Sequence, residues 1–212
     1  MNIMTMSRRS FCIAAVFSLS SLTELSVAAA VDDAPMALIK ATSDEVLAAI
    51  KENSEKIKTD PKVVNALVEK MVLPHIDFQT MSKLVLAVNW RKASAAQQAA
   101  FTDAFRDLLV RTYSKSLGEY DGQTVTYFPM RPESDPKEAL VRTEIQAKSG
   151  MPIPVAYRLR KNEQGVWRII DMVIDEVSLV TNYRNTFAQE VQRVGIDGLI
   201  KQLRNSNAEG NI

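Results

Sequence analysis

Residues 140–147 (LVRTEIQA) and 153–160 (IPVAYRLR) decide the fold class of this chain. In both stretches apolar side chains alternate with polar or charged ones, which is the period of a strand with one face against a core and one in water. The alternation predicts two half-buried antiparallel strands. Their inward residues are Val141, Thr143 and Ile145 in the first and Ile153, Val155, Tyr157 and Leu159 in the second.

Strand patterns continue on both sides of this pair. A short strand is predicted at 125–128, and residues 162–165 (NEQG) read as a turn. The stretch 166–180 reads as one long strand region with apolar residues on both faces, so we expect it to be central or covered on both sides. Together these stretches predict an antiparallel meander.

Before and after the strands the apolar period is near 3.6, which predicts helices. Capping boxes at Thr42–Glu45 and Ser94–Gln97 are typical of helix starts, and Asp60-Pro61 marks another. The predicted helices run from 42 to about 58, from 61 to about 73, from 78 to 88, from 94 to about 117, and from 182 to 203 with a break near Gly195 and Gly198. We therefore predict an α+β fold in which N-terminal helices and a C-terminal helix pack on a curved antiparallel sheet and enclose an apolar pocket.

The first thirty residues are typical of an export signal. Arg8 and Arg9 precede an apolar run at 11–22, and Ala28–Ala30 supplies small residues for cleavage. The run is shorter than the roughly 20 apolar residues that a spanning helix needs. We expect residues 1–30 to be a cleaved signal peptide, by the Sec or the twin-arginine route, and residues 31–212 to form a single domain.

The charge and the cysteine content of the chain argue against some classes of partner and of covalent cross-link. The chain carries 26 basic and 25 acidic residues, and the predicted signal holds Arg8, Arg9 and Glu24, so the remainder is formally neutral. A neutral domain argues against nucleic acid as the main partner, because binding to phosphates needs surplus Lys and Arg. Cys12, the only cysteine, also lies in the signal, so no disulfide is expected in the domain.

Signs of catalysis are few. His75 is the only histidine, and no nucleophile elbow, P-loop or dinucleotide-binding glycine motif occurs. The cluster of Asp171, Asp175 and Glu176 is the one candidate for acid–base chemistry, although a carboxylate that pairs with an arginine or caps the backbone is the simpler reading of Asp171. We expect no enzyme, no cofactor and no metal site.

Aromatic and aliphatic residues at inward positions form either a packed core or a ligand pocket, and the pattern alone does not separate the two. Tyr120, Tyr127 and Trp167 belong to this inward group. If a pocket exists, the residues that share the inward phase and would line it are Tyr113, Leu117, Val141, Ile145, Val155, Tyr157, Leu159, Ile169, Val173, Tyr183 and Phe187.

The order and spacing of several motifs resemble the MlaC family, also called toluene-tolerance proteins. The motifs are LPHIDF at 73–78 with Trp90, the stretch 97–120, PIPVAYRL at 152–159, WRIID at 167–171, and VSLVTNYR at 177–184 with Phe187. They span nearly the whole predicted domain. Two positions depart from the family: Ala87 stands where a glycine is common, and Asp175-Glu176 where Glu-Gly is usual.

The resemblance implies a fold similar to the nuclear-transport-factor-2 class and a periplasmic carrier that holds phospholipid acyl chains in the pocket. It implies two partners, an outer-membrane lipoprotein and porin complex and an inner-membrane ABC transporter with an MCE-domain ring. Because the family also has a hopanoid-associated branch, the resemblance does not decide which lipid is bound. An enzyme of the ketosteroid-isomerase type, with Asp171 at a pocket floor, and a pure protein-interaction module remain alternatives.

Overall fold

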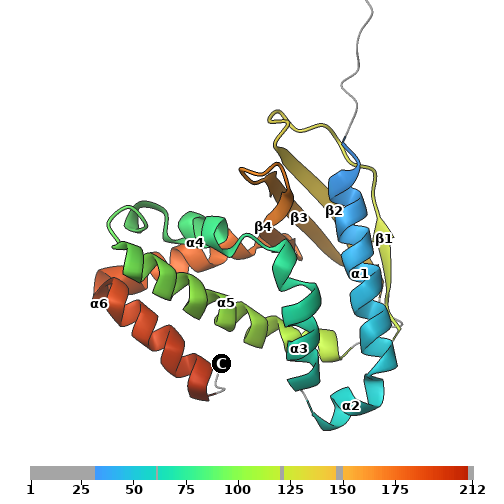
Figure 1. The fold of residues 1–212 in the computed structure, drawn as a ribbon, viewed down its shortest axis with the longest axis horizontal. Helices are drawn as coiled ribbons and strands as arrows, with labels where there is room; N and C mark the ends of the chain where they lie inside the picture. The colour runs from blue at the N-terminus through green and yellow to red at the C-terminus, as the bar shows by residue number, and fades with distance from the viewer. Residues whose placement is uncertain (1–31, 61, 120–121, 147–149, 210–212) are drawn as a thin grey trace, which may run out of the picture. The chain divides into compact units, whose positions relative to one another are not determined.

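The computed structural model describes residues 32–60, 62–119, 122–146 and 150–209. The predicted signal segment, Pro61 and Tyr120 lie outside the described residues. The described chain has helices, then a five-stranded antiparallel sheet, then a long helix, which confirms the α+β prediction (Figure 1).

Most of the helices that the structure describes come before the sheet, and one follows it. They are α1 (Ala34–Glu52), α2 (Ser54–Thr59), α3 (Lys62–Met71), α4 (Phe78–Leu86), α5 (Ala95–Gly118) and α6 (Leu179–Glu209), with short 3-10 helices η1 (Leu73–His75) and η2 (Ala87–Asn89) on either side of α4.

Helix α1 begins eight residues before the predicted capping box at Thr42–Glu45, so that prediction is wrong. Pro35 occupies the first turn, and the Asp32 side chain accepts a hydrogen bond from the Ala34 amide at 3.0 Å. Ile39, in the added part, is 3% exposed among the sheet residues. The burial of this added part favours the earlier helix start more strongly than the capping box favours a start at Thr42.

The second predicted capping box is confirmed at the start of α5. The Ser94 amide donates to Oε1 of Gln97 at 2.9 Å, and the Gln97 amide donates to Oγ of Ser94 at 3.2 Å. Both amides would otherwise lack helical partners. At α4 the Asp77 side chain accepts from the Thr80 amide at 2.9 Å and fixes that helix start.

The sheet is a meander in the order β1-β2-β3-β4-β5. Its strands are β1 (Thr124–Tyr127), β2 (Glu138–Gln146), β3 (Ile153–Lys161), β4 (Trp167–Ile174) and β5 (Val177–Ser178). The single strand predicted over 166–180 is wrong, because the chain turns at Asp175 and Glu176, both with positive φ, and α6 begins at Leu179.

A β-bulge in β4 changes which of its side chains lie on the same face of the sheet as Tyr157 and Leu159. Arg158 pairs with Asp171 while its neighbour Leu159 pairs with Ile169, so Ile170 is the extra residue. Ile169 therefore shares the face of Leu159. Beyond the bulge the partners are Met172 with Tyr157 and Val173 with Ala156. Val173 lies on the face opposite Tyr157, and its predicted inward position is wrong.

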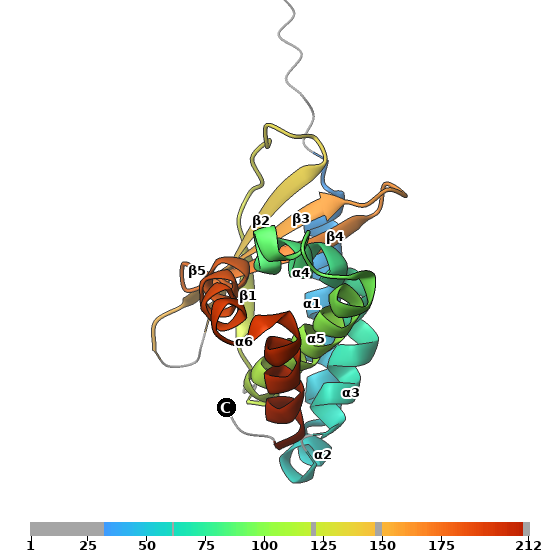
Figure 2. The same ribbon diagram turned by 90° about the vertical axis from the view of Figure 1, so that its left-hand side faces the viewer.

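Three buried clusters hold the domain together. The first joins α4, α5 and α6; the second joins α1 to the sheet; the third joins α1, α2 and α3 to α5. The predicted break in α6 is confirmed at Gly195, whose φ of 74° only glycine adopts easily. The break bends α6 into two arms, both visible in Figure 2, so that Phe187 and Leu199 enter the same cluster.

Candidate functional site

The inner face of the sheet, defined as the face that carries Val141 and Leu159, has one half that is fully packed. Val141 and Leu159 are 0% and 1% exposed, and both pack with Ile39 of α1. Ile169 and Trp167 complete this cluster, and Nε1 of Trp167 donates to Asp32 at 3.1 Å. Helix α1 therefore closes this half of the face.

The rest of the inner face keeps accessible surface. Tyr127, Ile145, Tyr157 and Met172 are only partly buried, although the strand register places them on the same face as Val141. A packed core would bury such side chains almost completely. We call this partly accessible part of the inner face the recess, which is where the sequence predicts the pocket.

The hydroxyl of Tyr157 is strongly desolvated. Burial raises the pKa of the Tyr157 hydroxyl to about 12, and nearby Tyr127 adds to the increase, whereas a hydrogen bond with Thr143 opposes it. The side chain nevertheless keeps some accessible surface. The hydroxyl of Tyr157 is therefore desolvated, although part of the residue stays accessible.

The helices supply three more partly buried candidates. Tyr113 of α5 and Tyr183 of α6 border the α4–α6 cluster, and Leu117 of α5 borders the α1–α3 cluster. Burial raises the pKa of Tyr113 to about 12, and the neighbouring Tyr183 hydroxyl contributes. Burial also raises the pKa of Tyr183. Each of these side chains packs against its cluster and keeps some accessible surface.

The eleven predicted site residues fall into three groups. Five are partly accessible: Tyr113, Leu117, Ile145, Tyr157 and Tyr183. Five are buried and support the walls: Val141, Val155, Leu159, Ile169 and Phe187. Val173 lies on the opposite face of the sheet.

The predicted site lacked Tyr127, Thr143 and Met172, which lie on the inner face. Tyr127 and Thr143 share the inward phase of their strands, so the alternation signal was sufficient to find them. Met172 could not be found in this way, because only the bulge at Ile170 brings it to the inner face.

Asp171 has a structural role. Its carboxylate is 2% exposed and accepts hydrogen bonds from Oγ of Ser178 at 2.7 Å and from the Val180 amide at 3.0 Å. It therefore caps the start of α6, as the simpler reading of the sequence proposed. An acid at a pocket floor would have to leave these partners.

Arg142, Arg158 and Arg184 are candidates from the sequence for contact with a lipid head group, but they lie away from the inner face. Arg142 and Arg158 are exposed and occupy the outer face of the sheet. Arg184 donates from Nε to the Leu84 carbonyl at 2.9 Å and ties α6 to α4. None of the three side chains faces the recess.

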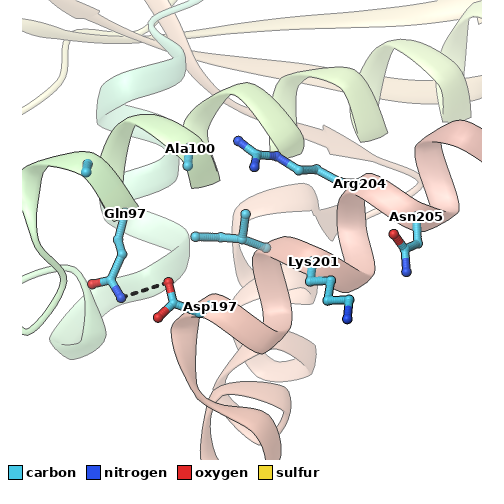
Figure 3. Close-up of a pocket in the computed structure, with 8 residues that line it drawn as sticks. Gln97, Ala100, Asp197, Lys201, Arg204 and Asn205 are labelled. Atoms are coloured by element: carbon cyan, nitrogen blue, oxygen red, sulfur yellow. Dashed lines mark hydrogen bonds between the residues drawn. The ribbon is translucent and has the colours of Figure 1, made fainter.

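Two surface clefts between helices carry charged side chains. One, of about 380 Å³, lies between α5 and α6, where Gln97 donates to Asp197 at 2.9 Å beside Lys201 and Arg204 (Figure 3). The other, of about 590 Å³, is lined by residues such as Glu69, Arg106 and Asp107. Charged side chains make both unsuitable for acyl chains.

Within the described ranges, no three His, Cys, Asp or Glu side chains gather in a metal-binding arrangement. Among the helices that the structure describes, none is long and apolar enough to cross a membrane.

Comparison with known proteins gives a consistent result. The family model described as MlaC protein matches residues 40–205. The toluene tolerance protein ttg2D of Pseudomonas putida is 29% identical over 164 residues, 77% of this chain and 75% of that protein. An intermembrane phospholipid transport system binding protein MlaC from Haemophilus influenzae is 27% identical over 180 residues, 84% of each chain.

A solved structure matches as well. It is the phospholipid-binding protein from Ralstonia solanacearum in complex with a phospholipid, with a TM-score of 0.75 and 32% identity. The match covers 82% of this chain and 97% of that one.

Proposed function

Because this chain belongs to the MlaC family, we propose that it binds a phospholipid by its acyl chains and carries it between membranes. The observation that carries the proposal is the partly accessible inner face of the sheet, which carries Ile145, Tyr157 and Met172. Tyr113 and Tyr183 of the helices are further candidates for contact with the lipid. The solved relative that holds a phospholipid has the same fold, which supports the assignment.

The energetics suit a carrier. Each buried methylene contributes about 0.8 kcal/mol, so one long acyl chain offers on the order of 10 kcal/mol. A bilayer offers the chain a comparable free energy, so the protein can hold a lipid without trapping it. The sequence carries no nucleotide-binding motif, and we assign the direction of transport to the partners.

For those partners we propose an outer-membrane lipoprotein and porin complex and an inner-membrane ABC transporter with an MCE-domain ring. The Haemophilus relative is named for an intermembrane phospholipid transport system, which supports this assignment. The predicted signal at residues 1–30 is consistent with a periplasmic location between the two membranes.

The first test is native mass spectrometry of protein purified from a Gram-negative host. We expect a co-purifying phospholipid that denaturation releases. Protein that stays lipid-free after exchange with phospholipid vesicles would overturn the proposal. Bound hopanoid in place of a two-chain lipid would assign the protein to the hopanoid branch instead.

A matched pair of variants tests the location of the site. Met172 and Val173 are adjacent and both partly buried, but only Met172 lies on the inner face. We expect Met172→Glu to reduce lipid occupancy at least tenfold, because a carboxylate in the recess must be desolvated. Val173→Glu should keep occupancy within twofold. Circular dichroism confirms folding, and equal occupancy in the two variants would place the lipid elsewhere.

A further inference from the structure

The recess contains one hydroxyl whose hydrogen-bonding capacity is unused. The hydroxyl oxygen of Tyr127 is buried and has no hydrogen-bond partner among the described residues. Tyr127 pairs with Thr143 across β1 and β2, which places it on the inner face. A buried polar group without a partner costs free energy, and native proteins rarely retain one without a reason.

The neighbouring hydroxyls are already engaged. Oγ of Thr143 donates to the Val155 carbonyl at 3.0 Å, and the Tyr157 hydroxyl shares a hydrogen bond with Thr143. Tyr127 lies close enough to Tyr157 to affect its ionisation, so the three hydroxyls form one polar spot in an apolar wall. Within this spot, Tyr127 is the residue with a proton to donate.

Tyr127 also lies close to the surface of the domain. Its strand, β1, is at the edge of the sheet, and Nζ of the exposed Lys40 lies 5.2 Å from the centre of its ring. The ring thus reaches from the surface of the domain inward, with its hydroxyl buried. This position suits the part of a lipid where the chains join the polar end.

The chemistry of a phospholipid indicates which of its groups can accept a hydrogen bond from Tyr127. Hydrocarbon chains accept no hydrogen bond, and a charged phosphate is costly to bring into an apolar site. The ester carbonyl is neutral, accepts a hydrogen bond and is attached directly to the chain. We propose that the Tyr127 hydroxyl donates to an ester carbonyl of the bound lipid and so selects ester-linked over ether-linked chains.

This inference rests on the proposed function, and its test is a competition between two lipids. Vesicles contain equal amounts of dioleoyl phosphatidylcholine and its di-O-oleyl ether analogue, which share chains and head group but differ in the carbonyls. Delipidated protein is loaded from them, and mass spectrometry gives the ratio of bound lipids. We expect the wild type to favour the ester by about tenfold, the size expected for one hydrogen bond to a buried donor.

Two variants locate the preference. Tyr127→Phe keeps the ring and removes the hydroxyl, so its ester-to-ether ratio should fall to about one. Ser82→Ala is the control, because Oγ of Ser82 is also buried without a partner but belongs to α4 and not to the sheet. Ser82→Ala should keep the wild-type ratio.

Thermal unfolding of lipid-free protein separates lipid recognition from a structural role. If the hydroxyl serves the ligand, lipid-free Tyr127→Phe should be at least as stable as the wild type. A lower melting temperature than the wild type would show a structural role and overturn the inference. Equal loading of the two lipids by the wild type, an unchanged ratio in Tyr127→Phe, or a lost preference in Ser82→Ala would overturn it as well. Failure of the wild type to load either lipid would contradict the proposed function itself.

Discussion

The α4–α6 cluster and the inner face of the sheet use similar residues for different purposes. In the cluster, Phe101 and Phe105 are 0% exposed, and Phe187 meets their rings edge-on at 5.8 and 5.9 Å. On the sheet, Tyr127 and Tyr157 stay partly accessible. Three helices cover one another in the first region, whereas α1 closes only half of the sheet in the second. Coverage, and not residue type, separates a core from a recess.

The two regions also differ in the kind of aromatic residue that they contain. The buried aromatic residues of the cluster are Trp90, Phe101, Phe105 and Phe187, whereas the partly accessible sheet face carries Tyr127 and Tyr157. Tyrosine offers an apolar ring with a polar end, which suits a wall that meets a ligand with both kinds of surface.

The largest expected effect comes from truncation of the cluster. Phe105→Ala should lower the free energy of unfolding by about 3–5 kcal/mol, because it removes a fully packed ring and leaves a cavity. Ile145→Ala, on the partly accessible sheet face, should cost about 1 kcal/mol or less in lipid-free protein. Urea denaturation measures both. Similar losses would mean that the recess is packed as tightly as the cluster.

The next largest effect is a loss of folding stability at alkaline pH. The pKa values of Tyr113 and Tyr157 are raised to about 12 from an ordinary value of 10, so the folded state keeps protons that the unfolded state loses. Stability should therefore be constant with respect to these groups below about pH 9 and should fall from pH 10 to 12. The slope is about 1.4 kcal/mol per pH unit and tyrosine at most.

Urea denaturation at several pH values, with tyrosinate absorbance, measures this effect. Tyr157→Phe removes one ionisable group and should make the decline less steep. A variant with the wild-type slope would show that the Tyr157 hydroxyl is solvated in the folded protein.

The smallest effect concerns backbone strain in each region. Ala87, after α4, has φ of 49°, and Glu176, in the turn between β4 and β5, has φ of 64°. Side chains disfavour these conformations, and the two positions are those where the family commonly has glycine. Ala87→Gly and Glu176→Gly should each stabilise the protein by roughly 0.5–1 kcal/mol.

A substitution of the same kind in a helix provides the control. Ala99 is exposed inside α5, so Ala99→Gly should destabilise by about 1 kcal/mol. Thermal or urea unfolding gives the sign. Destabilisation by Ala87→Gly or Glu176→Gly would mean that these turns are not strained.

The sequence by itself determined the elements whose signals are local. Alternation at 140–147 and 153–160 predicted β2 and β3, the Ser94–Gln97 box fixed the start of α5, and Gly195 marked the break in α6. Family membership followed from motif order, which depends on many positions at once and tolerates local errors.

Only the tertiary structure decided where α1 begins, which residues of β4 face inward, and which inward residues remain accessible. Burial of Ile39 against the sheet extends α1 past a capping box that is locally favourable. The extra residue Ile170 exchanges Met172 for Val173 on the inner face. Leu159 and Tyr157 have the same phase, yet Leu159 is 1% exposed and Tyr157 stays partly accessible, because burial depends on elements distant in sequence.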